Sequence, residues 1–262
     1  MKKKIGIVGL GYIGQTISDA INEEKIDAEV RATYDIDEKK MQKIKAESPL
    51  VRLMSHATDF QDCDIVVECA TQKVVEELFD AIVESGKYFI PMSIGAFITL
   101  PALYSKYLEL DETKKSKILL PSGAIGGFDC IETINLEGVK SAKLITRKPN
   151  SVFINHEYII SHKIELDDDS PTTIFEGNAR LAASSFPRSI NVAARLALST
   201  LGPEETLVEI IADPTISQNI HMIKIESTVG AYSFKFANNP SPTNPKTSWL
   251  AALSAIHTIK KI

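Results

Sequence analysis

The sequence predicts an α/β protein: an N-terminal parallel sheet covered by helices, a second α+β domain, and a C-terminal helix that returns to the first domain. Three observations lead to this fold class. Short apolar runs alternate with helix-like segments through the first half of the chain. A glycine-rich turn at residues 9–14 joins the first run to the first helix, and after about residue 125 longer alternating strands replace the earlier pattern.

Each element of the first half has a local reason. Ile13, Ile17 and Ile21 recur at every fourth residue, which places them on one face of a helix. The run 64–70 (DIVVECA) is apolar on both faces, as in a central parallel strand with helices on both sides. Gly86 is a suitable end for the helix that follows this run. The strands expected here are 4–10, 28–35, 64–70, 88–92 and 118–120, and the further helices are 38–47, 72–85 and 100–110.

The second half mixes strands and helices without regular alternation. Residues 147–175 contain KPN and DDDSP, which predict turns and an exposed connection, and the Phe-Pro pair at 186–187 separates two helices. The strands expected here are 139–146, 207–212, 222–227 and 231–236, and the helices are 176–185, 191–200 and one after residue 248. We therefore expect a first domain of residues 1–125 together with the terminal helix 246–262, and a second domain of residues 126–245.

Composition excludes several classes of protein. The 262 residues include 29 Lys and Arg against 34 Asp and Glu, a net charge of −5, which argues against nucleic acid as a partner. Three cysteines are too few for a disulfide framework, and no apolar run reaches the length of a membrane span. We expect a cytoplasmic enzyme that acts on a small molecule and holds no metal.

The segment 9–14 (GLGYIG) matches the pattern G-x-G-x-x-G between a predicted strand and a helix. These glycines allow a tight turn, a close approach to a pyrophosphate and tight packing of helix on strand, while the helix N-terminus offers N–H groups to the phosphates. The motif therefore predicts a dinucleotide-binding domain. The residues expected to bind the cofactor through this motif are Gly9, Gly11, Tyr12, Ile13 and Gly14.

An acid at the end of the second strand completes the pattern. Asp35 lies 21 residues after Gly14, where a carboxylate accepts the ribose hydroxyls and repels a 2′-phosphate. NAD is therefore the expected cofactor, with NADP as the alternative because Lys39 and Lys40 follow closely. Two more candidate contacts are Ala70 and Thr71, at the carboxyl end of the central strand; the alternative is that they simply end the strand.

Two further features suggest chemistry. The loop from Ser122 to Gly127 contains three glycines and would form either a floor beneath the nicotinamide or the substrate carboxylate, or a hinge between domains. Of the five histidines, His221 is the one that shares a strand face with another polar residue, Asn219. An imidazole with its ordinary pKa of about 6.5 is suited to accept a proton, although a lone histidine is more often structural.

The sequence resembles the L-aspartate dehydrogenase family. The matching segments run in order along the chain: GLGYIG (9–14), PSGAIGG (121–127), TRKP (146–149), FEGNARLAASSFPRSINVAA (175–194), ADP (212–214), NIH (219–221) and NPKTS (244–248). The resemblance implies that Ala124 and Asn191 contact NAD, that His221 is catalytic and that the chain forms a homodimer. Residues 150–174 match no part of the family pattern.

By this resemblance the substrate is L-aspartate, oxidised to iminoaspartate and then hydrolysed to oxaloacetate and ammonia, in a reversible step that feeds NAD biosynthesis. Ser122, Asn219 and Lys246 are the expected ligands of the substrate, and Lys246 is the second candidate for the base. Two alternatives remain. The first is another two-domain enzyme, a homoserine dehydrogenase or a dihydrodipicolinate reductase, and the second is a non-enzymatic NAD-sensing protein.

Overall fold

The structure is a computed structural model that describes residues 2–187, 190–241 and 248–262. The chain forms two compact units, which are described one at a time: unit 1 is Met1–Gly123 with Ala251–Ile262, and unit 2 is Ala124–Leu250. In the described part of the chain, the longest helix is too short and too polar to cross a membrane.

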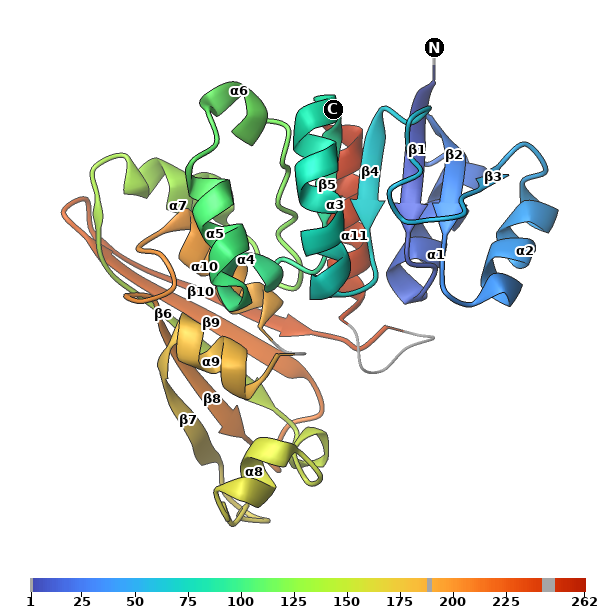
Figure 1. Cartoon of the computed structure of the whole chain (residues 1–262). Helices are drawn as coiled ribbons and strands as arrows, with labels where there is room; N and C mark the ends of the chain where they lie inside the picture. Colours follow the sequence, from blue (N-terminus) through green and yellow to red (C-terminus); the bar gives the residue numbers. More distant parts are fainter. Residues whose placement is uncertain (1, 188–189, 242–247) are drawn as a thin grey trace. The chain divides into compact units, whose positions relative to one another are not determined.

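Unit 1 holds a five-stranded parallel sheet in the order β3-β2-β1-β4-β5 (Figure 1). The strands are β1 (Lys3–Val8), β2 (Ala28–Tyr34), β3 (Arg52–Leu53), β4 (Ile65–Glu68) and β5 (Tyr88–Pro91). The helices are α1 (Tyr12–Asn22), α2 (Glu38–Glu47), α3 (Gln72–Ser85), α4 (Ala96–Thr99), α5 (Pro101–Leu108), α6 (Glu112–Lys115) and α11 (Trp249–Lys260). The strand expected at 118–120 does not form, because Ile118 makes only an isolated bridge to Phe89.

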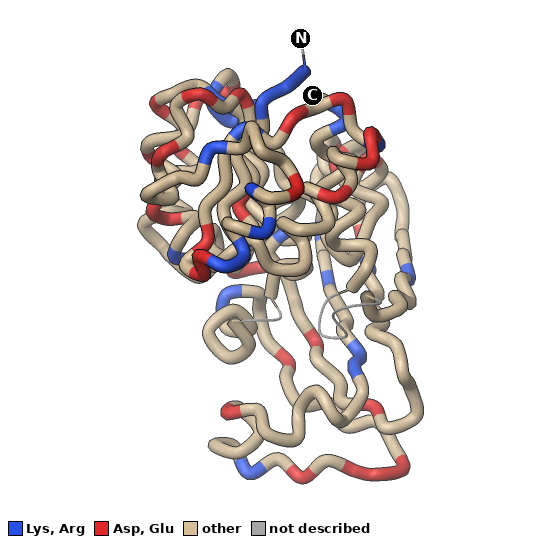
Figure 2. Tube along the Cα trace, turned by 90° about the vertical axis from the view of Figure 1, so that its right-hand side faces the viewer, with Lys and Arg blue, Asp and Glu red and all other residues tan. Residues whose placement is uncertain are grey.

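The two faces of this sheet are covered by different helices. Ile7 and Val67 point to the face on which Ile17 of α1 and Ala255 of α11 are buried, all in one apolar cluster. Helix α3 packs on the other face, where its buried Phe79 stacks edge-on against Phe97 of α4. Burial on both faces explains why β4 is apolar almost throughout. Lys and Arg residues are mixed with Asp and Glu along this unit (Figure 2).

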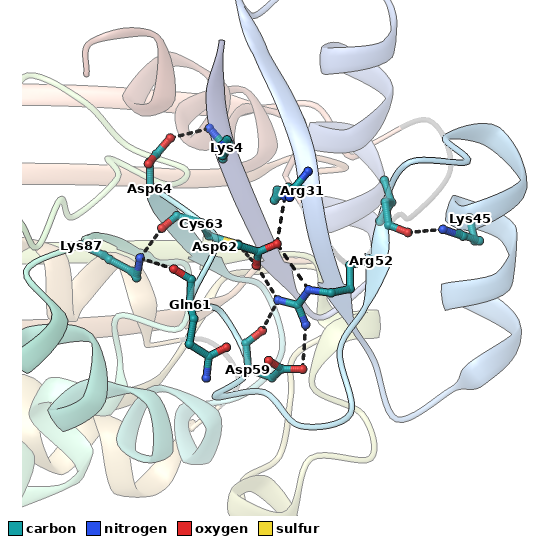
Figure 3. A network of polar contacts seen from close by, with 11 residues as sticks. Lys4, Arg31, Lys45, Arg52, Asp59, Gln61, Asp62, Cys63, Asp64 and Lys87 are labelled. Atoms are coloured by element: carbon teal, nitrogen blue, oxygen red, sulfur yellow. Dashed lines mark hydrogen bonds and ion pairs between the residues drawn. The ribbon is translucent and has the colours of Figure 1, made fainter. Parts of the chain in front are cut away.

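A polar network lies at the end of the sheet where β1 begins. Arg52 donates from Nη1 to Asp59 at 2.7 Å and pairs through Nη2 with Asp62 at 2.5 Å (Figure 3). Arg31 donates to the same Asp62 carboxylate, at 2.9 Å. These bonds fasten the loop between β3 and β4 to β2 and β3, at the end of the sheet opposite to the glycine turn.

Unit 2 contains a mixed five-stranded sheet in the order β10-β9-β6-β8-β7, in which only β6 and β8 are parallel. The strands are β6 (Val139–Lys148), β7 (Thr172–Asn178), β8 (Leu207–Ala212), β9 (Asn219–Ser227) and β10 (Ala231–Asn238). The helices are α7 (Phe128–Asn135), α8 (Glu157–Ser161), α9 (Ala179–Ser185) and α10 (Asn191–Ser199), with a 3-10 turn at Asn150–Val152. Together, the two units confirm the predicted fold class.

Two expectations for unit 2 are wrong in detail. Residues 176–178, expected to be helical, form the end of edge strand β7, and the helix begins only at Ala179. Asn178 marks that start, because its side chain accepts a hydrogen bond from the N–H of Leu181 at 2.9 Å. The segment 147–175 is also more than a connection, since it contains the end of β6, helix α8 and the start of β7.

Candidate active site

The glycine turn after β1 provides an open helix N-terminus. Gly9 has a positive φ of 96°, and a Cβ there would lie 2.6 Å from the Cys69 carbonyl carbon. At Gly14 a Cβ would lie 2.1 Å from the carbonyl oxygen of Gly9, so α1 can pack this tightly only with glycine. A Cβ added to Gly11, the N-cap of α1, would have no neighbouring atom within 4 Å, and no side chain caps the helix. The cradle is therefore open on the side where a pyrophosphate would bind.

Asp35 is tied to this turn. It is only 8% exposed, and its Oδ2 accepts the N–H of Leu10 at 2.7 Å, while Oδ1 accepts the N–H of Asp37 at 2.9 Å. Lys40 on α2 lies 3.5 Å from Oδ2. Each carboxylate oxygen has a second lone pair, so Asp35 can still accept ribose hydroxyls after making these bonds. Because Asp35 also fixes the N–H of Leu10, it shapes the glycine turn.

Ala70 and Thr71 are exposed where β4 ends, at the carboxyl edge of the parallel sheet. The Thr71 side chain caps α3 by accepting the N–H of Val74 at 3.4 Å. The N–H of Ala70 is held by the carboxylate of Glu68 at 2.6 Å. Both positions share an edge with the glycine turn, as dinucleotide binding in this sheet type requires.

The loop 122–127 is anchored within each unit separately. The N–H of Gly123, whose φ is 65°, donates to Ser254 Oγ of α11 at 3.0 Å in unit 1. In unit 2 the carbonyl of Ala124 accepts a bond from Asn238 Nδ2 at 2.7 Å. Ser122 is partly buried just before this point, and Asn191 is the first residue of α10 in unit 2.

His221 lies on β9 and is buried, with 4% of its surface exposed. Its Nδ1 is 3.0 Å from Oγ1 of Thr146, the residue directly opposite on β6. Burial, helped by the charge of Lys148, lowers the pKa of His221 to about 3. The imidazole is therefore neutral at physiological pH, and a hydrogen on Nδ1 shared with Thr146 would leave the lone pair of Nε2 available. This corrects the expectation of an ordinary histidine pKa.

Lys148 lies on the same strand face as Thr146, two residues further along β6. The register pairs Arg147 with Ile220, so one more step brings Lys148 opposite Asn219. Burial lowers the pKa of Lys148 to about 8, and the residue lines a small cavity with Thr146, Phe153 and Ile190. Thr146, Lys148, Asn219 and His221 thus form one group, which we call the His221 cluster.

The sequence identified two members of this cluster and missed two. The shared strand face points to Asn219 and His221. Thr146 and Lys148 have the same spacing on β6, but they lie where the sequence pattern of the strand gives way to the predicted connection. Lys246, selected as a substrate ligand and second candidate base, lies outside the described residues.

Comparison with known proteins identifies the family. Residues 129–262 match the family described as aspartate dehydrogenase, C-terminal, and residues 9–121 match the NAD-binding domain of homoserine dehydrogenase. An L-aspartate dehydrogenase of Methanosarcina mazei is 39% identical over 99% of this chain and 96% of the relative. The chain belongs to the L-aspartate dehydrogenase family. Another member of this family, from Nitrosopumilus maritimus, is 35% identical over the same shares of the two chains.

Solved structures agree with this assignment to the aspartate dehydrogenase family. The crystal structure of aspartate dehydrogenase from Thermotoga maritima has a TM-score of 0.75 and 27% identity, covering 100% of this chain and 97% of that one. A myo-inositol dehydrogenase of Corynebacterium glutamicum, with a TM-score of 0.52 and 14% identity, shares the fold alone. As a member of this family, the chain is an NAD(P)-dependent dehydrogenase whose Rossmann-type unit 1 is an NAD-binding domain. The open cradle at Gly11 and the uncapped start of α1 fit that cofactor.

Proposed function

We propose that the protein oxidises L-aspartate with NAD, with NADP as an alternative cofactor, to iminoaspartate, which hydrolyses to oxaloacetate and ammonia. The observation that carries this proposal is the His221 cluster, in which a neutral, buried imidazole lies beside a lysine and an amide on one face of the sheet of unit 2. These groups suit an amino acid that carries a second carboxylate. The match of residues 129–262, which contain the whole cluster, to the aspartate dehydrogenase family supports the same substrate.

In the proposed cofactor site, the motif residues Gly9, Gly11, Tyr12, Ile13 and Gly14 hold the pyrophosphate, and Asp35 accepts the adenosine ribose hydroxyls. Ala70 and Thr71 add contacts at the carboxyl edge of the sheet, and by the family resemblance we propose Ala124 and Asn191 as further NAD contacts. Bound NAD supplies the acceptor for the hydride. Support comes from the open space at Gly11 and from the exposure of Ala70 and Thr71 at the carboxyl edge of the sheet.

In the proposed substrate site, Lys148 and Asn219 bind the carboxylates of aspartate, together with Ser122 and Lys246. Nε2 of His221 accepts a proton from the substrate nitrogen, and the Cα–H bond breaks with its electron pair leaving as hydride. Burial is the main cause that lowers the pKa of His221, and the charge of Lys148 adds to it; a substrate carboxylate beside Lys148 would offset only this second cause. In the reverse direction the same groups would serve the amination of oxaloacetate.

The decisive experiment is NAD reduction with L-aspartate, compared with D-aspartate, L-glutamate and L-homoserine. L-Homoserine is included because the family matching residues 9–121 is named for homoserine dehydrogenase. We expect L-aspartate alone to give rapid reduction. Preferred use of L-homoserine would contradict the proposal, and cofactor binding without any turnover would favour an NAD-sensing protein.

The role of His221 has its own test. His221→Ala should lower turnover of L-aspartate by about 10²-fold or more while the affinity for NAD changes little, because the imidazole acts on the substrate. Unchanged turnover would remove His221 from the reaction. We further propose that the protein is a cytoplasmic homodimer that supplies NAD biosynthesis; light scattering of the purified protein would test the dimer.

A further inference from the structure

Glu68 is a buried acid that the proposed reaction does not use. It is the last residue of β4, an interior strand between β1 and β5 in the parallel sheet of unit 1, and none of its surface is exposed. Ionised carboxylates are rarely buried without compensating partners, because the charge loses its hydration. The partners of Glu68 therefore indicate what this acid does.

The carboxylate of Glu68 joins two loops at the carboxyl edge of the sheet. Its Oε1 accepts the N–H of Ala70 at 2.6 Å and the hydroxyl of Ser93 at 3.0 Å. Its Oε2 accepts the N–H of Ser93 at 3.0 Å. Ala70 follows β4 and Ser93 follows β5, so one side chain fixes the exits of two adjacent strands.

The Ala70 segment in turn supports the glycine turn. The N–H of Cys69 donates to the carbonyl of Val8 at 2.7 Å, and a Cβ on Gly9 would lie 2.7 Å from the nitrogen of Ala70. The turn and the Ala70 segment are therefore in direct contact. A shift of Ala70 would be transmitted to the turn that we propose as the pyrophosphate site.

We propose that Glu68 is a positioning residue for NAD(H), whose ionised carboxylate holds Ala70 and Thr71 against the glycine turn and thereby shapes the edge that the cofactor crosses. This inference rests on the proposed cofactor site. It needs no contact between Glu68 and the cofactor, since the carboxylate acts through the backbone N–H groups of Ala70 and Ser93.

The ionisation of Glu68 provides a readout that a purely structural role would not give. Burial raises the pKa of Glu68 to about 7, against the opposing effect of the hydrogen bonds from Ser93 and Ala70. The neighbouring titratable group is the Cys69 thiol, whose own pKa is raised by burial and by Glu68, so it stays uncharged. As the pH falls through about 7, Glu68 takes up a proton and the carboxylate that holds both loops is lost.

Glu68→Gln is the informative variant. Each carboxylate oxygen receives a backbone N–H, whereas an amide has one acceptor oxygen and must turn an NH₂ group toward either Ala70 or Ser93. The matched control is Glu77→Gln, the same chemical change at an exposed position of α3. NADH affinity is measured by fluorescence titration between pH 6 and 8.5, without aspartate, alongside thermal unfolding.

We expect Glu68→Gln to bind NADH about tenfold more weakly at pH 8, the effect of losing one charge-assisted hydrogen bond. Its affinity should be independent of pH, whereas the wild type and Glu77→Gln lose affinity below pH 7. Equal affinity in the two variants, or the same pH dependence, would overturn the role of Glu68. If wild-type protein binds no NADH, the proposed cofactor site itself fails.

Ser93→Ala covers the case in which Glu68→Gln does not fold. This variant removes the hydroxyl bond to Glu68 but keeps the backbone N–H. Because that hydroxyl bond favours the ionised acid, its loss should move the midpoint of the pH dependence of NADH binding upward. An unmoved midpoint in a folded Ser93→Ala protein would contradict the proposal.

Discussion

Nδ1 of His221 lies 3.0 Å from Oγ1 of Thr146, and the two side chains face each other across adjacent antiparallel strands. Both residues are buried, so water does not compete for this bond. The hydroxyl therefore orients the imidazole, and when it accepts a hydrogen from Nδ1 the lone pair of Nε2 is left free to accept a proton.

Thr146→Val should test this relationship, because it removes the hydroxyl and keeps the branched shape. A neutral hydrogen bond contributes about 1 kcal/mol, so we expect kcat with L-aspartate to fall about fivefold, with NAD affinity unchanged. Thr146→Ser, which keeps a hydroxyl, should restore most of the activity. If serine restores nothing, Thr146 serves packing alone.

The lowered pKa of Lys148 leads to a prediction of how the binding of aspartate depends on pH. Its pKa is lowered to about 8, so its charge is present below that pH and is lost above it. The KM for L-aspartate should therefore rise as the pH increases through 8. Lys148→Met should raise this KM about tenfold or more at pH 7, since a charge-assisted hydrogen bond is lost.

Lys148→Arg is the matched control, because its guanidinium stays charged throughout the range. Its KM for aspartate should change less with pH than that of the wild type, and NADH affinity should be the same in all three proteins. A KM that is insensitive to Lys148→Met would exclude this lysine as a carboxylate ligand.

Much of this architecture could be predicted from local sequence, and the failures have physical causes. The glycine turn and the longer strands of unit 1 have clear local patterns, although β1 pairs with β4 sixty residues away. The short strand β3 (Arg52–Leu53) has no such pattern and is not predicted from the sequence. The strand at 172–178 forms because it pairs with β8, whose partner residues lie 29 to 40 positions away in the sequence, and a local pattern does not reveal this pairing. Thr146 and His221 are likewise 75 residues apart. Glu68 could have been noticed from the sequence, because it is the one acid in its strand, IVVE, and comes directly after three apolar residues.

The charge of Asp35 leads to a prediction of the preference for NAD over NADP. Its carboxylate would repel the 2′-phosphate of NADP, and Lys40, 3.5 Å away, is held near it. Asp35→Asn removes the charge and keeps an acceptor for Leu10, so the ratio of kcat/KM for NADP over NAD should rise about tenfold. Lys40→Gln should reduce activity with NADP more than with NAD. An unchanged ratio in Asp35→Asn would place the 2′-phosphate away from this carboxylate.

The lowered pKa of Asp62 implies that this residue contributes to the stability of the fold in a pH-dependent way. The hydrogen bond from Arg52 is the main cause that lowers its pKa from 3.8 to about 2, and Arg31 adds to the effect (Figure 3). An acid with a lowered pKa stabilises the fold fully above its unfolded value of 3.8, and this stabilisation disappears as the pH falls through about 2. Asp62→Asn should therefore lower the free energy of unfolding at pH 7 by about 1–2 kcal/mol.

Urea unfolding at pH 7 and at pH 2.5 would check this prediction. The difference between wild type and Asp62→Asn should be clear at pH 7 and smaller at pH 2.5, because at pH 2.5 the carboxylate is protonated in the unfolded chain although it is still largely ionised in the fold. The matched control is Asp80→Asn, which breaks the exposed ion pair with Lys106. Exposed pairs contribute about 0–1 kcal/mol, so this control should be nearly neutral. An equal loss in both variants would mean that the Arg52 network adds no more than a surface ion pair.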